Sequence, residues 1–235
     1  MDSLLNCTDC PRVAGFLVNV RTKHPDYHAL PVEPFGDEKA RLLIVGLAPG
    51  MHGANRSGRP FTGDYAGVLL YETLHQFGFA SHPQSLSRDD GLLLRDCRIT
   101  NAVKCLPPEN KPEPAEVKNC NRYLSRELQT SPDVHVILAL GTVAHKAVLM
   151  ALGLRQSAVA FAHNARHQLP DNKVLIDSYN CSRYNTNTRR LTTQGFHDVF
   201  RSIRAELDKT TVIPAKAGIQ RRSTSKDTGS PPSRG

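Results

Sequence analysis

The sequence predicts an α/β fold: a three-layer α/β/α sandwich with a central, mostly parallel sheet. Short runs of apolar, β-prone residues are separated by stretches with helical spacing, and the runs cover 42–45, 99–103, 134–140 and 174–176. Runs that are apolar throughout and alternate with helices are typical of a parallel sheet covered on both faces. A ligand of such a sheet lies at the carboxyl ends of its strands.

The first run leads through a glycine-rich block, 46–64, into a predicted helix over 66–77. The second run is followed by a proline-rich segment, 106–114, which keeps the chain open until a helix begins over 116–128. The last helix has the clearest period, because apolar residues recur at i, i+3, i+4, i+7 and i+11. These residues are Phe196, Val199, Phe200, Ile203 and Leu207.

A chain of 235 residues fits one large domain, which we place at 1–209 and follow with a basic, disordered tail at 210–235. The tail carries +4 of the net charge of +8. The mildly basic body fits either a local DNA-binding face or scattered surface charge. No apolar run reaches the ~20 residues of a membrane helix. The N-terminal residues lack a basic region and a long apolar core, so we expect a cytoplasmic protein.

The block 46–64 is the segment most typical of a ligand site, and it reads GLAPGMHGANRSGRPFTGD. Its glycines let the backbone approach a ligand closely, because glycine has no Cβ atom. The block also holds a carboxylate, two arginines, a histidine and a lone aromatic. These residue types suit a pocket that stacks a planar base while its neighbours bind phosphate.

Six cysteines form a second feature, with Cys7 and Cys10 in a C-x-x-C pair. Without a secretory signal, structural disulfides are disfavoured, which leaves a metal site, redox chemistry or simple burial. Cys105 and Cys120 flank the proline-rich segment and complete a possible set of four thiolates. Four thiolates hold either a [4Fe–4S] cluster or zinc, and spacing alone does not choose between them.

The glycine-rich block resembles the first motif of the uracil-DNA glycosylase superfamily, most closely that of its family 5. The segments 100–108, TNAVKCLPP, and 178–188, SYNCSRYNTNT, follow in the order of the later motifs. The resemblance extends from about position 7 to 207. It implies the uracil-DNA glycosylase fold, itself a parallel sheet between helices, and a [4Fe–4S] cluster on Cys7, Cys10, Cys105 and Cys120. Cys97 and Cys181 remain outside that set, the first as a buried apolar side chain and the second in the site loop.

The resemblance also assigns the residues that would hold a flipped base. Phe61 matches the family's stacking phenylalanine, although a core role is the alternative. Asn101 matches the asparagine that pairs with uracil through its donor and acceptor, although a turn cap after a strand is the alternative. The backbone of Gly46 and Ala48 is expected to bond the base.

Asp64 matches the aspartate that in family 5 activates water or stabilises the sugar cation. From the residues alone, Asp64 is instead predicted as the N-cap of the following helix. His52, Asn55 and Arg56 match the family block and are expected to orient substrate or bind phosphate. His163 and His167 are assigned to a loop or to DNA contact, without a role in the chemistry.

The chain departs from the family at Asn180, where a histidine normally donates a hydrogen bond to the base. An asparagine amide still donates, but it is neutral and weaker, and loss of one such donor costs about 10²–10³ in rate. Arg189 stands where the family often has glycine. Arg183 in the same loop is a candidate for insertion into DNA or phosphate binding, with a plain surface arginine as the alternative.

The predicted protein is a monofunctional glycosylase that removes uracil, with hypoxanthine and other deaminated bases as further candidates, in base excision repair. Its expected partner is DNA that contains such bases, and a monomer suits an enzyme that scans DNA. One alternative is a catalytically weakened DNA-binding member of the fold, disabled at Asn180. Another is a zinc-stabilised protein that binds nucleotides or RNA.

Overall fold

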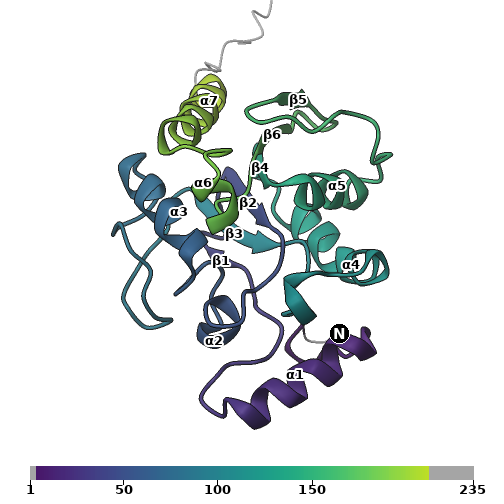
Figure 1. The fold of residues 1–235 in the computed structure, drawn as a ribbon. Coiled ribbons are helices and arrows are strands. Elements are labelled where there is room, and N and C mark those ends of the chain that lie inside the picture. Colours follow the sequence, from purple (N-terminus) through teal and green to yellow (C-terminus); the bar gives the residue numbers. More distant parts are fainter. Residues whose placement is uncertain (1–3, 212–235) are drawn as a thin grey trace, which may run out of the picture.

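The computed structural model describes residues 4–211, which form a six-stranded sheet in the order β1-β3-β2-β4-β6-β5 (Figure 1). The four inner strands run parallel to one another. They are β3 (Cys97–Asn101), β2 (Leu42–Gly46), β4 (Val136–Leu140) and β6 (Val174–Ser178). The predicted mostly parallel sheet is therefore confirmed, and each inner strand overlaps one of the four apolar runs.

Two short antiparallel strands complete the sheet at its edges. β1 (Phe35–Gly36) pairs with β3, and β5 (Arg166–Gln168) pairs with β6. Neither was predicted, because two or three residues with partly exposed side chains carry no apolar pattern. His167, which the sequence assigned to a loop, lies on β5.

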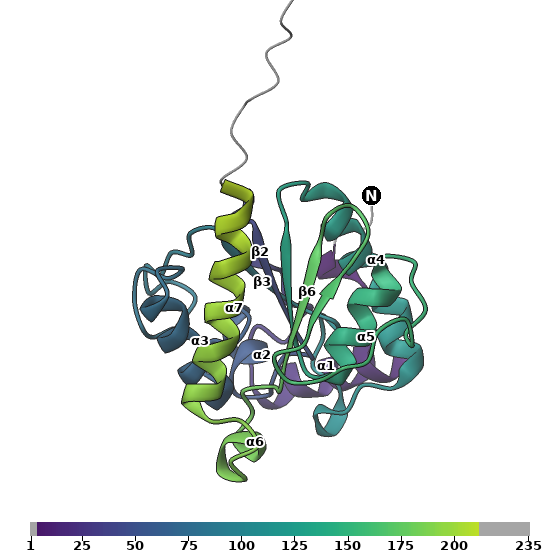
Figure 2. The same cartoon turned by 90° about the horizontal axis from the view of Figure 1, so that it is seen from above.

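Helices cover both faces of the sheet (Figure 2). α3 (Tyr65–Gln76) and α7 (Thr193–Thr211) lie on one face, and α4 (Pro114–Thr130) and α5 (Thr142–Ala151) lie on the other. Alternate residues of one strand enter different cores: Leu42 and Ile44 pack toward α3 and α7, whereas Leu43 packs toward α4 and α5. The strands are apolar throughout because both of their faces are buried.

The helices begin where the sequence offers start signals. α4 begins at Pro114, two residues before the predicted start, because proline suits the first helical position. Glu113 and Glu116 form a capping box there, in which the Glu116 carboxylate accepts the Glu113 N–H at 2.7 Å. The short helices α2 (Ala54–Ser57) and α6 (Arg183–Asn187) lie within connections, and α6 projects beyond the layers (Figure 2).

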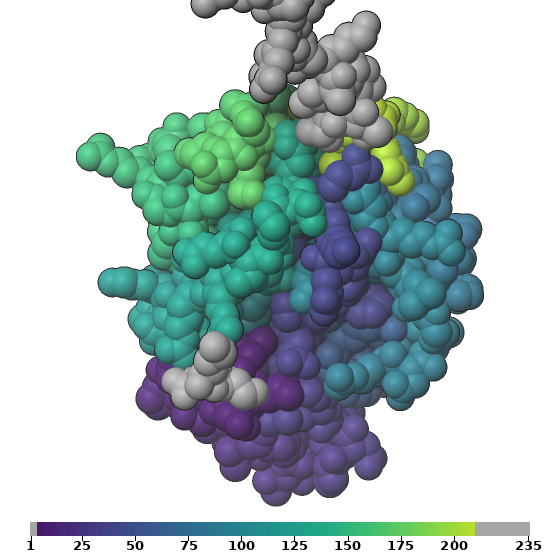
Figure 3. Space-filling view, turned by 180° about the vertical axis from the view of Figure 1, so that it is seen from behind, coloured from purple at the N-terminus to yellow at the C-terminus, as the bar shows by residue number. Residues whose placement is uncertain are grey.

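The N-terminal segment forms a small third core. η1 (Leu4–Asn6) leads to α1 (Pro11–Lys23), whose buried side chains pack against Ala29 and Leu106. From behind, this segment lies directly beside the α4 region (Figure 3). No helix in 4–211 combines the length and apolar character needed to cross a membrane. Of the predicted tail at 210–235, residues 212–235 lie outside the described part of the chain.

Candidate functional site

A pocket with a volume of about 380 Å³ opens where β2, β3 and β6 end. Pockets of this size suit small planar ligands. Six of the predicted site residues meet in its lining: Ala48, Phe61, Asp64, Asn101, Asn180 and Arg183. They come from segments far apart in the sequence, and the parallel sheet brings them together as its topology predicts.

Phe61 and Asn101 approach each other over Gly46, the last residue of β2. A Cβ atom at position 46 would come within 2.6 Å of the Phe61 ring and would overlap the Asn101 carbonyl oxygen. Glycine is therefore required for this close approach. Gly46 does not itself line the pocket and instead lies beneath the two side chains that do.

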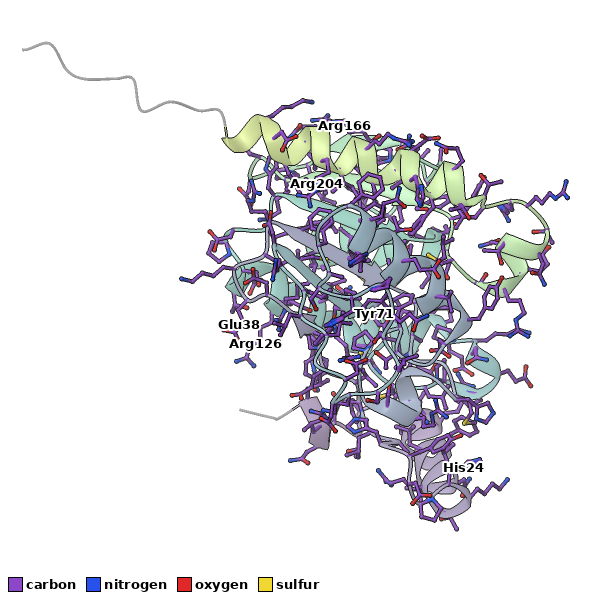
Figure 4. All side chains as sticks on the ribbon, turned by 90° about the vertical axis from the view of Figure 1, so that its left-hand side faces the viewer. His24, Glu38, Tyr71, Arg126, Arg166 and Arg204 are labelled. Atoms are coloured by element: carbon purple, nitrogen blue, oxygen red, sulfur yellow. The ribbon has the colours of Figure 1, made fainter. Side chains whose placement is uncertain are left out.

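Phe61 adopts a left-handed backbone conformation, with φ at 56°. Such a conformation costs a non-glycine residue about 1–2 kcal/mol, so the surroundings must hold it. The buried Tyr71 hydroxyl donates to the Pro60 carbonyl at 2.8 Å, from the interior position labelled in Figure 4. The buried guanidinium of Arg59 bonds Asp90 at 2.6 Å and anchors the other side of the turn. The aromatic ring is thus fixed before any ligand arrives.

Asn101 ends β3 and presents a buried acceptor to the pocket. Its side-chain Oδ1 atom has no hydrogen-bond partner among the described residues, although the residue is only 3% exposed. An unsatisfied buried carbonyl oxygen is costly and indicates that a ligand or water completes it. The turn-capping alternative for Asn101 gains no support, because no hydrogen bond from this amide to the described chain is present.

Asp64 stands at the N-cap position of α3, but its side chain does not cap that helix. The carboxylate turns toward the glycine-rich block, where Oδ2 accepts the Ala54 N–H at 3.1 Å. Burial raises the pKa of Asp64, against the opposing effects of the Ala54 hydrogen bond and the charges of Arg56 and His52. Asp64 is therefore the N-cap residue by position, as predicted, but its carboxylate serves the pocket and not the cap.

Asn180 follows β6 by two residues and lines the same pocket. Its Nδ2 atom makes a long contact of 3.5 Å with the Leu140 backbone carbonyl. The backbone carbonyl of Asn180 accepts a 2.8 Å hydrogen bond from the Asn185 side chain. One amide N–H therefore remains available to a ligand. The neighbouring Cys181 is fully buried in the core, and burial raises the pKa of its thiol to about 12, so it is no nucleophile.

Arg183 extends along the rim of the pocket with its guanidinium 4.9 Å from the centre of the Tyr65 ring. Tyr65 lines the pocket and was missed, although it directly follows Asp64 in the sequence. Tyr184 was also missed, and it stands 70% exposed on α6 beside Arg183. An exposed aromatic on a projecting helix is a candidate to contact unstacked bases. Sequence patterns do not distinguish such a residue from a core aromatic.

Besides Gly46, the predicted residues His52, Asn55 and Arg56 of the glycine-rich block do not line the pocket. His52 is exposed and bonds the Tyr27 hydroxyl through Nδ1 at 2.8 Å. Asn55 is fully buried, and neither polar atom of its side chain has a partner among the described residues. By contrast Asn110, which was not predicted, enters the pocket from the proline-rich segment.

A second pocket is lined by all four predicted metal-ligand cysteines, Cys7, Cys10, Cys105 and Cys120. Burial, and after it the charges of the other thiols, raise the pKa of the Cys105 thiol. The Lys104 backbone N–H donates to the Cys120 sulfur at 3.2 Å. A set of four sulfurs with an N–H donor suits a soft metal centre. Cys97 lies apart, fully buried in the core.

The sequence matches the family model described as the uracil DNA glycosylase superfamily over residues 33–204. It is 46% identical over 204 residues to the type-5 uracil-DNA glycosylase of Thermus thermophilus, covering 85% of this chain and 93% of that protein. It is 40% identical over 210 residues to the type-5 uracil-DNA glycosylase of Pyrobaculum aerophilum, covering 88% and 91%. A type-4 uracil-DNA glycosylase of Archaeoglobus fulgidus is 36% identical over 126 residues, 53% of this chain and 55% of that protein.

Proposed function

The chain belongs to the uracil-DNA glycosylase superfamily, and we propose that it hydrolyses the N-glycosidic bond of uracil in DNA during base excision repair. The observation that carries the proposal is the pocket in which an aromatic ring, an unpartnered amide oxygen and a half-buried carboxylate converge. The relatives favour this hydrolase over the alternative of a DNA-binding protein without excision.

Base recognition begins when uracil leaves the duplex and stacks on Phe61. Asn101 then reads the edge of the base, because Oδ1 accepts from the uracil N3–H and Nδ2 donates to O4. Cytosine presents the opposite pattern, with an unprotonated N3 and an amino group. An Asn101 amide in this orientation therefore distinguishes uracil from the normal base from which it arises. The volume of about 380 Å³ leaves room for hypoxanthine as a further substrate.

Cleavage breaks the bond between C1′ of the sugar and N1 of uracil, and the electron pair leaves with the base. The Asp64 carboxylate stabilises the developing positive charge on the sugar and accepts a proton from the water that adds to C1′. The Asn180 amide donates to the base oxygen O2 as negative charge collects there. The products are free uracil and an abasic site. No lysine lines the described pocket, so strand cleavage through a Schiff base is not proposed.

We further propose that the four cysteines hold a [4Fe–4S] cluster, as the family resemblance implies. The four cysteines line one pocket, and the Lys104 N–H donates to one of their sulfurs. A set of four thiolates suits such a cluster. The cluster would join the N-terminal segment to the loop that carries Asn110.

The test is single-turnover excision of uracil from a labelled duplex by the wild type, Asp64→Asn and Asn180→His. We expect excision by the wild type, loss in Asp64→Asn and a faster rate in Asn180→His. Asp171→Asn, at an exposed turn position, is the matched control and should leave the rate unchanged. If none of the three test proteins excises uracil although each still binds DNA, the proposal is overturned. Iron and sulfide analysis of the same preparation tests the cluster, and zinc without iron would refute it.

A further inference from the structure

Tyr179, the residue immediately before Asn180, is held by the side chain of His163. The two rings are stacked, with centroids 5.1 Å apart and planes only 3° from parallel. The guanidinium of Arg190 also lies over the Tyr179 ring, 4.4 Å from its centroid. The loop that carries Asn180 is therefore clamped at its first residue by groups from two other segments.

A hydrogen bond also joins His163 to Tyr179. The Tyr179 backbone N–H donates to Nδ1 of His163 at 3.3 Å. A ring nitrogen that accepts must be unprotonated, so the proton of the neutral imidazole lies on Nε2. Nε2 faces Gly195 at the start of α7, where an added Cβ atom would lie 3.3 Å from it. His163 thus joins the Asn180 loop to α7.

The segment that carries His163 is itself tied to β6. The Asn164 N–H donates to the Asp177 carbonyl at 2.8 Å, and the Asp177 N–H donates to the Ala165 carbonyl at 3.0 Å. The buried Asp177 carboxylate is bonded in turn by His145 and His167, at 2.8 and 3.0 Å. Arg166 lies alongside α7 (Figure 4), where it bonds Glu206 at 2.8 Å. The segment that carries His163 is therefore held to β6 and α7 by these hydrogen bonds.

Asn180 has few restraints of its own. Its side chain makes one long contact with the Leu140 carbonyl, so its direction depends on the backbone that precedes it. We propose that His163 is a positioning residue for excision: by accepting the Tyr179 N–H, it aims the Asn180 amide at the base as charge develops. The inference rests on the proposed function of Asn180. A misplacement of about 1 Å costs about 100-fold in rate.

The charge state of His163 agrees with this role at neutral pH. Burial lowers the pKa of His163, against the opposing effects of the Gly195 hydrogen bond and the charge of Asp198. The cationic Arg190 contacts the same tyrosine ring. A neutral ring with a free Nδ1 lone pair is the form that accepts the backbone hydrogen bond.

The experiment measures single-turnover uracil excision and DNA affinity separately for the full chain. His163→Phe retains an aromatic ring but lacks the acceptor, and we expect its maximal rate to fall about 10- to 100-fold with little change in Kd. His163→Asn supplies an acceptor near the position of Nδ1 and should restore the rate to within about threefold of the wild type. His135→Asn is the control, since His135 is also a half-buried histidine but lies at the amino end of β4.

A double-mutant cycle separates positioning from a purely structural role. In an Asn180→Ala background we expect His163→Phe to cause no further loss of rate, because the group that it aims is gone. Three outcomes would overturn the inference and leave the proposed function intact. The losses of rate from His163→Phe and Asn180→Ala could be additive, a change in Kd could account for the whole loss, or His163→Asn could fail to restore the rate. Absence of excision by the wild type would overturn the proposed function, and the positioning role with it.

Discussion

The Asp64 carboxylate occupies space that two glycines leave open. A Cβ atom on Gly50 would come within 2.8 Å of Asp64 Oδ1, and one on Gly53 would overlap the carboxyl carbon itself. These glycines are therefore needed for the shape of the site, because the backbone of the block passes directly against the reacting group. The density of glycine in the sequence indicated a close approach, but it did not show that a side chain of the same block makes it.

Gly53→Ala should displace the Asp64 carboxylate and lower the single-turnover excision rate by about 100-fold or more. The fold should persist, because the overlap is with the end of one side chain at the pocket surface and not with backbone. Gly15→Ala on α1 is the matched control, since an added Cβ there meets nothing within 4 Å. That control should keep full activity and gain up to about 1 kcal/mol in unfolding free energy. Equal activity of the two variants would contradict the close-packing argument.

The pH dependence of excision should report Asp64. Burial raises the pKa of this carboxyl above its ordinary value of 3.8, so a proton is lost only at higher pH than in a free side chain. Since the carboxylate is the active form, the rate should fall as pH drops through that raised pKa. A pH–rate profile under single turnover measures the midpoint. An acid limb at or below pH 3.8 would contradict the proposed environment.

Among the elements, the inner strands and the helices α3, α4 and α7 were predicted individually, whereas α1 and α5 were not, although both have buried apolar side chains. The inner strands are recognised as continuous apolar runs, and α7 by its regular apolar period. α6 has no buried residue, and the sequence signals it only through the Ser182 cap, whose hydroxyl accepts the Asn185 N–H at 3.4 Å. Arg189 just beyond it has a φ of 56°, the conformation that favours glycine, which explains the family preference at that place.

The candidate site was predictable to the extent that its residues sit in motifs. Asp64, Asn101 and Asn180 were identified and do converge, because each follows a strand of one parallel sheet. Tyr65 and Asn110 were missed, since only the folded chain turns them toward the pocket. Asn55 was placed in the site by its motif, yet it is buried away from the lining. The position of a residue in a motif therefore does not determine where its side chain points.

A buried group of two histidines and one aspartate stabilises the end of β6. His145 directs Nδ1 at Asp177 and Nε2 at the Val159 carbonyl, so both of its nitrogens face acceptors. Burial lowers the pKa of His145, but the hydrogen bond and charge of Asp177 outweigh it, and the net shift is upward. The protonated form is therefore the one that the folded protein favours.

Asp177→Asn should lower the unfolding free energy by about 3–5 kcal/mol, because it leaves a buried histidine without its counter-charge. In the wild type, the contribution of His145 is complete below its unfolded pKa of about 6.5 and is lost as pH rises through the raised folded value. Denaturant unfolding at several pH values measures both effects. Asp133→Asn, at an exposed position, is the control. A wild type and an Asp177→Asn variant that respond equally to pH would refute this account.

At the scale of the whole molecule, the N-terminal segment is attached more weakly than the sheet. Its apolar core is small and separate from the two main cores, with Val13, Leu17 and Val20 against Ala29 and Leu106. The Arg12 guanidinium bonds the Glu116 carboxylate at 2.8 Å, and Arg122 of α4 pairs with Asp9. The proposed cluster would add a covalent connection to these surface ion pairs.

Loss of the cluster should loosen the N-terminal segment and the proline-rich loop together. In Cys105→Ser we expect faster amide hydrogen exchange over 4–23 and 106–113, with the inner strands unchanged. Excision should also fall, because the loop presents Asn110 to the pocket. Cys97→Ala is the control. Because Cys97 is buried in the main core, away from the four cysteines, this variant should keep its iron. Unaltered exchange in Cys105→Ser would contradict the connecting role.

The two edge strands bear on how the protein behaves at high concentration. β1 has two residues and β5 has three, and each covers a flank of the long parallel strands with an antiparallel stub. A neighbouring molecule therefore finds no extended ladder of free N–H and C=O groups onto which it can add a strand. An apolar sheet of this kind is a template for aggregation when its flank is bare. Here the edge strands offer only two and three residues for such pairing, which disfavours the addition of a strand from another copy.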